Sequence, residues 1–186
     1  MWPYPAPLDD GAADHLHSGT KLPDVSLTST IEENVSLAKQ PGNFILFVYP
    51  WTGRAGFSNP NGWDHIPGAH GSTAEAEGFR DLYQNYKQKG FCIFGMSAQS
   101  TNWQRELSER LQLSYALLSD EGFFFSDALR LPSFSIEGVK FLKRLTLVCA
   151  EGKIIQTVYP VHPPDRHAYD LLSGLEKGSA EKRRQT

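Results

Sequence analysis

The sequence has little of several features that define whole classes of protein. Its 186 residues include two cysteines, too few for a disulfide framework and without the spacing of a zinc site. No run of about 18 apolar residues is present, and the first ten residues lack the basic and apolar regions of a secretion signal. We therefore expect a cytoplasmic protein that has no membrane partner and no metal or other cofactor.

Charge of one sign is not concentrated either. The formal net charge is -3, and the one basic cluster, Lys182-Arg183-Arg184, lies at the end of the chain. Nucleic-acid binding needs a basic field, so we expect no nucleic-acid partner. The expected partners are a small-molecule substrate and a second copy of the chain in a homodimer.

What is present indicates one globular domain. Apolar residues make up 40% of the chain and aromatic residues 12%, at a length near the common domain size. Residues 1–21 are rich in proline, glycine and polar groups, which predicts an extended N-terminal arm that could wrap a partner subunit. Residues 22–176 form the predicted domain, and residues 177–186 a polar tail that we expect to be disordered. Cys92 and Cys149 lie in apolar runs and are expected to be inert thiols in the core.

Apolar periodicity predicts alternating strands and helices. Strands are predicted at 24–28, 44–49, 91–97, 115–119, 134–137, 144–150 and 153–159, and helices at 72–89, 100–111, 121–129 and 165–175. Glu151-Gly152 is typical of a tight turn, so the last two strands should form a hairpin. The order predicts an α/β sandwich in which helices flank a central mixed sheet.

The stretch between Tyr49 and Ser72 has no periodic apolar pattern, and a loop of this length in a compact domain is usually functional. Its aromatic residues either pack beneath the loop or line a pocket. Its histidines either act as general acids or bases or make structural hydrogen bonds. The candidates here are Tyr49, Trp51, Trp63, Asp64, His65 and His70.

The loop delivers the chain to the start of the predicted 72–89 helix. Ser72-x-x-Glu75 before an amphipathic run is typical of a capping box, in which Ser72 accepts a hydrogen bond from a backbone N-H and Glu75 reaches back. A cap at an exposed helix end is compatible with contact between Ser72 and a ligand. Either way, this helix start is the predicted site.

The run Gly71-Ser72-Thr73, followed by Gly78-Phe79-Arg80-Asp81, resembles the peroxiredoxins of the alkyl hydroperoxide reductase/thiol-specific antioxidant superfamily. The resemblance extends over about residues 20–175 and implies a thioredoxin-like fold with an N-terminal extension. It puts Ser72 in place of the peroxidatic cysteine and Glu77 in place of the resolving cysteine, with Ala69 where the wider family has threonine. A serine hydroxyl ionises too weakly to replace a thiolate, so thiol peroxidase chemistry is not implied.

The resemblance also implies a role for Arg144, because peroxiredoxins place an arginine there beside the reactive cysteine. A guanidinium group and the free N-H groups of a helix start, brought to one spot, would bind an oxyanion with or without a thiol. The central hypothesis is that Arg144 and the helix that begins at Ser72 meet in this way.

Three functions follow as alternatives. The first is a non-thiol enzyme that isomerises, dehydrates or cyclises a small carbonyl or anionic substrate of the kind found in specialised metabolism. Its candidate catalytic residues are Ser72, Arg144, His70, Glu77 and His65, and its candidate substrate-binding residues are Thr73, Tyr49, Trp51, Trp63 and Asp64. The second is a one-cysteine peroxiredoxin, if Ser72 replaces a natural cysteine. The third is a non-catalytic pseudoenzyme or binding module.

Overall fold

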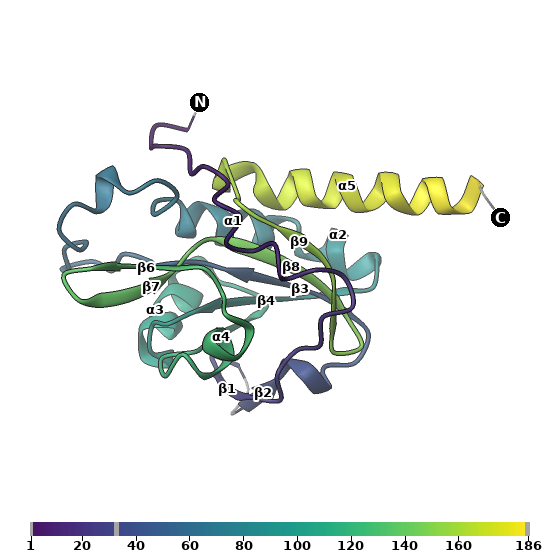
Figure 1. Cartoon of the computed structure of the whole chain (residues 1–186), viewed down its shortest axis with the longest axis horizontal. Helices are drawn as coiled ribbons and strands as arrows, with labels where there is room; N and C mark the ends of the chain where they lie inside the picture. Colours follow the sequence, from purple (N-terminus) through teal and green to yellow (C-terminus); the bar gives the residue numbers. More distant parts are fainter. Residues whose placement is uncertain (1, 32–33, 185–186) are drawn as a thin grey trace.

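A computed structural model of the chain describes residues 2–31 and 34–184, with side chains up to 177. It has a seven-stranded mixed sheet in the order β2-β1-β5-β4-β3-β8-β9 and a separate β6-β7 hairpin (Figure 1). The strands are β1 (Ser26–Ser29), β2 (Asn34–Ser36), β3 (Asn43–Val48), β4 (Phe91–Ser97), β5 (Ala116–Ser119), β6 (Ser133–Ile136), β7 (Val139–Leu142), β8 (Leu145–Ala150) and β9 (Lys153–Val158). The helices are η1 (Leu37–Lys39), η2 (Trp63–His65), α1 (Ser72–Asp81), α2 (Tyr83–Gln88), α3 (Thr101–Leu111), α4 (Phe124–Leu129) and α5 (Pro164–Arg184).

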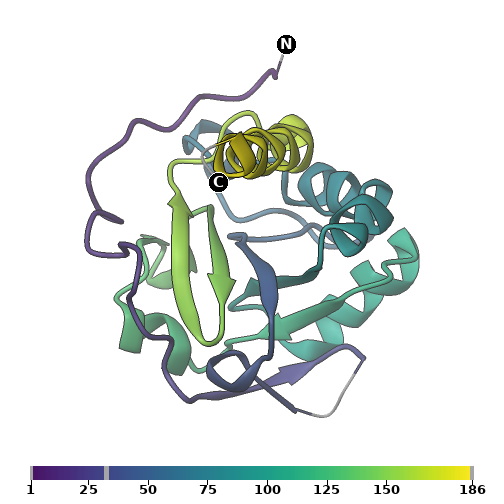
Figure 2. The same cartoon turned by 90° about the vertical axis from the view of Figure 1, so that its right-hand side faces the viewer.

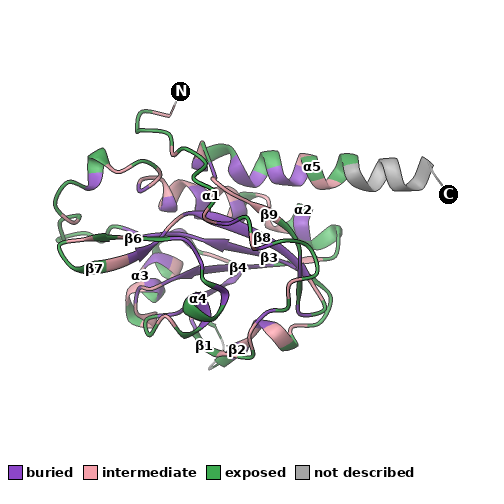
Figure 3. Ribbon diagram, viewed as in Figure 1, coloured by how far each residue is buried: buried purple, intermediate pink, exposed green. Residues whose placement is uncertain are grey.

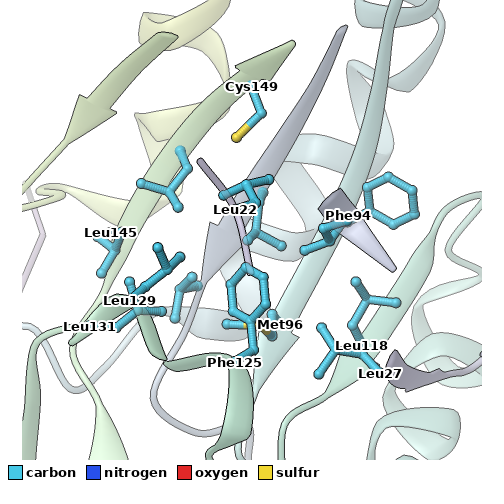
Figure 4. Close-up of a cluster of buried hydrophobic side chains, with 14 of the residues drawn as sticks. Leu22, Leu27, Phe94, Met96, Leu118, Phe125, Leu129, Leu131, Leu145 and Cys149 are labelled. Atoms are coloured by element: carbon cyan, nitrogen blue, oxygen red, sulfur yellow. The ribbon is translucent and has the colours of Figure 1, made fainter. Parts of the chain in front are cut away.

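Both faces of the sheet are buried, and side chains that alternate along the central strands build two cores. On β3, Phe44 and Leu46 belong to a cluster that includes residues of α4 and of the N-terminal arm (Figure 4). Ile45 and Phe47 belong to the opposite cluster, which α1, α2, α3 and α5 cover. Figure 3 shows the resulting buried centre of the sheet. The predicted α/β sandwich with a mixed sheet is thus confirmed.

Most predicted elements are present, with three differences. β2 and β7 are short strands that were not predicted. The 72–89 helix is divided at Leu82, where ψ is 8° and the backbone leaves the helical region. α5 continues to Arg184, so residues 177–184, expected to be disordered, are helical. Residues 185–186 of the predicted tail, and the side chains of Lys182-Arg183-Arg184, lie outside the described part.

The predicted hairpin is confirmed, since Ala150 pairs with Lys153 across Glu151 and Gly152, both of which have positive φ. The prediction for the cysteines is half right. Cys149 on β8 is fully buried, and burial raises the pKa of its thiol to about 12. Cys92 is exposed, because it lies near the start of β4, at the margin of the core.

The N-terminal arm lies along its own domain (Figure 2). Asp10 accepts a hydrogen bond from the Tyr159 hydroxyl at 2.7 Å and pairs with Lys143. Further along, Leu16 is buried in the core, and Gly19 donates its N-H to the carbonyl of Ile154 on β9. The arm is therefore part of the fold. Among the described residues, no helix is long and apolar enough to cross a membrane.

The sheet also places the site. β3 ends at Val48, and the loop of residues 49–71 then leads to the first residue of α1. Val48 pairs with Leu145, so Arg144, just before β8, lies at the same end of these two strands as the start of the loop. The β6-β7 hairpin supports the loop, since Phe141 on β7 packs with the buried Trp63.

Candidate functional site

The start of α1 is built differently from the predicted capping box. Gly71 is the N-cap, with φ 106°, and its carbonyl accepts the N-H of Glu75 at 2.9 Å. Ser72 is the first helical residue and makes no side-chain cap. The capping-box prediction is wrong because the loop enters α1 through a left-handed backbone that favours glycine. The N-H groups of Ser72, Thr73 and Ala74 point out of the helix start, as in any first turn.

We expect Gly71→Ala to lower the free energy of unfolding by about 2–3 kcal/mol or more, because strain adds to a steric clash. A Cβ at this position would lie 2.2 Å from Pro164 Cγ and 2.7 Å from a ring carbon of Trp2. Gly19→Ala is the matched control, since Gly19 has φ 92° but no atom within 4 Å of a built Cβ. Urea denaturation should show a clearly smaller loss for the control. Equal losses would mean that only backbone strain acts at Gly71.

Arg144 does meet the start of α1, but from the interior of the protein. Its Nη2 donates to Ser72 Oγ at 3.0 Å and to the carbonyl of His70 at 3.1 Å. Its Nη1 forms an ion pair with Glu75 Oε2, and both side chains are at most 2% exposed. The carboxylate therefore compensates the guanidinium charge that the hypothesis assigned to a substrate.

This ion pair is shielded from solvent. Burial raises the pKa of Glu75 to about 7, and Arg144 opposes that increase. Glu75 Oε1 and Arg144 Nε have no hydrogen-bond partner among the described residues. Nearby, His167 shares a 2.8 Å hydrogen bond with Thr146, and burial together with Arg144 lowers its pKa to about 4.

The contact with Arg144 determines what the Ser72 hydroxyl can do. A guanidinium only donates, so Ser72 Oγ accepts from Arg144 and keeps its own proton for another acceptor. The N-H groups of the first turn are donors at the same helix end, and the hydroxyl lies beside them within the protein, since Ser72 is 3% exposed. Donors arranged in this way stabilise negative charge that develops on a carbonyl oxygen.

His70, two residues before α1, forms a polar pair with Asp64 across the loop. Its Nε2 lies 2.7 Å from Asp64 Oδ1, and its ring stacks on Tyr4 with centroids 3.7 Å apart. A carboxylate only accepts, so Nε2 carries the proton and the lone pair of the neutral ring is on Nδ1. In this arrangement His70 could act as a general base, and the Asp64 carboxylate fixes the orientation of its ring.

These groups meet at a cavity of about 340 Å³ over the start of α1. It is lined by backbone and side chains of the loop, of α1 and of the arm: Trp2, Tyr4, Trp51, Gly53, Asn59, Trp63, Ala69, His70, Gly71, Ser72, Thr73, Ala74 and Glu77. The tryptophans line this space and do not fill it. The structure therefore brings together six of the predicted site residues: Ser72, Thr73, His70, Glu77, Trp51 and Trp63.

Four other predicted residues are placed differently. Asp64 takes part only through His70. Arg144 reaches Ser72 from behind and lines a different cavity, beneath the arm. Tyr49 is fully buried in the core, and His65 is exposed and does not line the cavity over α1. The predictions for Tyr49 and His65 are therefore corrected. The type of a residue in a strand or loop does not show which way its side chain points.

Sequence reasoning missed two aromatic members of the cavity wall, Trp2 and Tyr4. Two large aromatic residues within an otherwise polar, proline-rich arm were the available signal. The arm is held there by the hydrogen bond from the N-H of Gly68 to the carbonyl of Pro5, at 3.2 Å.

Neither cysteine sulfur is close to this cavity. Cys92 and Cys149 both pair with Phe44, near the beginning of β3, whereas the loop to α1 leaves from its end. Cys149 is five residues along the strand from Arg144, or about 17 Å. Among the described residues, no group of three or more histidine, cysteine or acidic side chains could hold a metal ion.

Comparison with known proteins agrees with the geometry of the fold. The chain is 26% identical over 175 residues to the chloroplastic peroxiredoxin Q of Suaeda salsa, covering 93% of this chain and 74% of the plant protein. It is 30% identical over 163 residues to that of Triticum aestivum, covering 87% and 67%. The peroxidoxin BcpB of Mycobacterium tuberculosis has a similar solved structure, with TM-score 0.69, 22% identity and coverage of 88% and 98%.

A cysteine-to-serine variant of the peroxiredoxin Q of Xylella fastidiosa gives TM-score 0.70 at 19% identity, covering 89% of this chain and 98% of that chain. These likenesses define a thioredoxin-like fold of the peroxiredoxin type. The Redoxin family matches residues 17–172. The chain belongs to this family.

Proposed function

We propose that this redoxin-fold protein is an enzyme without thiol chemistry that moves a proton next to the carbonyl group of a small substrate. The observation that carries the proposal is the His70–Asp64 pair, with its 2.7 Å hydrogen bond, in the wall of the cavity that Ser72 and Thr73 also line. A base and a set of oxyanion donors at one cavity are the two parts that enolisation needs.

The proposed reaction needs only groups that line the cavity. The C-H bond next to the carbonyl breaks, its proton passes to His70 Nδ1, and its electron pair moves onto the carbonyl oxygen. The Ser72 hydroxyl and the N-H groups of the first turn of α1 stabilise the resulting enolate. Return of this proton from His70 Nδ1 to another carbon gives isomerisation. Departure of a hydroxyl group from the neighbouring carbon, which takes the proton from His70 and leaves as water, gives dehydration.

In this proposal Arg144 does not bind the substrate, contrary to the first hypothesis. It positions Ser72 and the His70 carbonyl through the hydrogen bonds of Nη2, and Glu75 balances its charge. Arg144 is thus a positioning residue. We retain the cytoplasmic location and the homodimer as predictions.

Proton exchange tests the proposal without knowledge of the full reaction. The protein is incubated in D₂O with 2-oxo acids and simple ketones, and ¹H NMR follows loss of the signal next to the carbonyl. We expect protein-dependent exchange for at least one compound. A panel in which no compound exchanges faster than in buffer would leave only the non-catalytic binding role.

A peroxide assay separates this proposal from a one-cysteine peroxiredoxin. With dithiothreitol as reductant, the protein should consume no hydrogen peroxide above background, because its two cysteine thiols lie away from α1. Consumption by the protein itself would contradict the proposal. If Ser72→Cys alone gains turnover while the protein catalyses no exchange, the peroxiredoxin alternative is favoured.

A further inference from the structure

The cavity over α1 has a second chemical character besides its oxyanion donors. Four of its lining side chains are aromatic, namely Trp2, Tyr4, Trp51 and Trp63, and none is lysine or arginine. Glu77, half-buried, is the carboxylate among them, and His70 donates its Nε2 proton to Asp64. Aromatic ring faces and carboxylates both carry negative potential, so a cation in this cavity is stabilised where it lies over a ring or beside Glu77.

The two characters occupy different places along α1. Ser72 and Thr73 lie at the helix start, and Glu77 lies five residues further, a rise of about 7–8 Å. A carbonyl or carboxylate group at the first-turn donors therefore leaves room for a positively charged group a few bonds away. Such a group would lie among the rings beside Glu77.

We propose that the substrate class is a small carbonyl or carboxylate compound that also bears an alkylated ammonium group. This inference rests on the proposed function for the placement of the carbonyl end. An alkylated ammonium is favoured over a primary amine because it loses little hydration and presents methyl groups to the rings. The aromatic wall then selects the substrate, while Ser72 and His70 act on it.

The arm completes the cation site. Trp2 and Tyr4 belong to the segment held by the Gly68–Pro5 hydrogen bond, and their ring centroids lie 5.9 Å apart. Trp51 and Trp63 come from the loop of residues 49–71 and are supported by Phe141, with centroid distances of 6.0 and 5.2 Å. Half of the aromatic wall therefore depends on the arm keeping its place.

The test compares three probes in tryptophan-fluorescence and NMR titrations at constant ionic strength. They are tetramethylammonium, trimethylammonioacetate, and 3,3-dimethylbutanoate, which has the shape of the second probe without its positive charge. We expect trimethylammonioacetate to bind best, 3,3-dimethylbutanoate at least ten-fold more weakly, and tetramethylammonium to bind measurably. Equal or tighter binding of 3,3-dimethylbutanoate, or no binding of tetramethylammonium, would overturn the inference.

Two variants locate the site. Glu77→Gln should raise the Kd of tetramethylammonium about five-fold, equivalent to about 1 kcal/mol, and leave that of 3,3-dimethylbutanoate unchanged. Tyr4→Leu, on the arm, should likewise raise the Kd of the cationic probes. Glu121→Gln is the matched control, because Glu121 is exposed and does not line the cavity. An equal effect of Glu121→Gln would show that only overall charge matters.

Failure of this inference can be told apart from failure of the proposed function. If the cationic probes bind as expected but no compound undergoes proton exchange, the cation site stands and the enzymatic proposal fails. If uncharged ketones or simple 2-oxo acids exchange while the cationic probes do not bind, the enzymatic proposal stands and the cation site fails.

Discussion

Replacing Arg144 with leucine is expected to lower the free energy of unfolding by about 3–5 kcal/mol at pH 8. The substitution leaves Glu75, which has no exposed surface, without its cation. The carboxyl group must then take up a proton, at a cost that grows as the pH rises above its ordinary pKa, or stay ionised without a partner, at a large cost that does not depend on pH. Urea denaturation followed by circular dichroism measures the loss.

The same substitution should cost less at pH 5. The pKa of Glu75 is about 7 in the folded protein and 4.5 as its ordinary value, so the native state binds this proton more tightly. Its contribution to stability is complete below about pH 4.5 and is lost as the pH rises through the native pKa. Without Arg144 the pKa of Glu75 in the native state rises further, so more of the free energy of unfolding is lost by pH 8. His167 acts in the same direction, because loss of Arg144 relieves the lowering of its pKa.

Two further variants check this account. Adding Glu75→Gln to Arg144→Leu should recover at least half of the loss at pH 8, since no buried charge remains. Lys143→Leu is the matched control, because its pairing with Asp10 is partly exposed and such pairs contribute at most about 1 kcal/mol. A loss that is independent of pH, or not recovered by the second substitution, would mean that the ion pair does not account for the stability.

His70→Gln is expected to lower the rate of proton exchange by about 10²–10⁴-fold on any carbonyl compound that the protein exchanges. Glutamine keeps a polar side chain but has no basic nitrogen at neutral pH. The comparison uses initial rates from ¹H NMR in D₂O at the same protein concentration. His17→Gln is the control, because His17 is exposed and does not line the cavity.

Asp64→Asn should lower the same rate by a similar factor for a different reason. An amide can donate to His70 Nε2, which moves the ring proton to Nδ1 and removes the lone pair that accepts the substrate proton. The Asp64 side chain is 71% exposed, so the substitution should not change stability by more than about 0.5 kcal/mol. Full activity in both variants would rule out the His70–Asp64 pair as the base.

The start of α1 shows where sequence reasoning succeeded and where it failed. The helix start and the loop before it were predicted, because apolar periodicity and its absence are local properties, whereas the approach of Arg144 was implied only by the family resemblance. The capping box was not formed, because the same Ser-x-x-Glu pattern permits another arrangement. Glu75 turned inward to Arg144, which is 69 residues away in sequence and adjacent only through the pairing of β3 with β8.

The N-terminal arm is a second example of a feature that its sequence predicted only in part. Its composition predicted an extended segment and nothing about where it lies. Trp2 and Tyr4 became part of the cavity because the arm packs along β9 and then binds the loop through Pro5. His65 and Tyr49, in contrast, looked like site residues only because they were near the others in sequence.

By itself the sequence determined the class of fold, the strand and helix order, the closing hairpin and the absence of a cysteine at the start of α1. These features depend on side-chain periodicity, turn chemistry and residue identity, which act over a few residues. The tertiary structure alone decided that Arg144 is neutralised by Glu75, that His70 pairs with Asp64, and that the arm's aromatic rings complete the cavity. Such contacts depend on side-chain direction and on long-range packing, which no local pattern encodes.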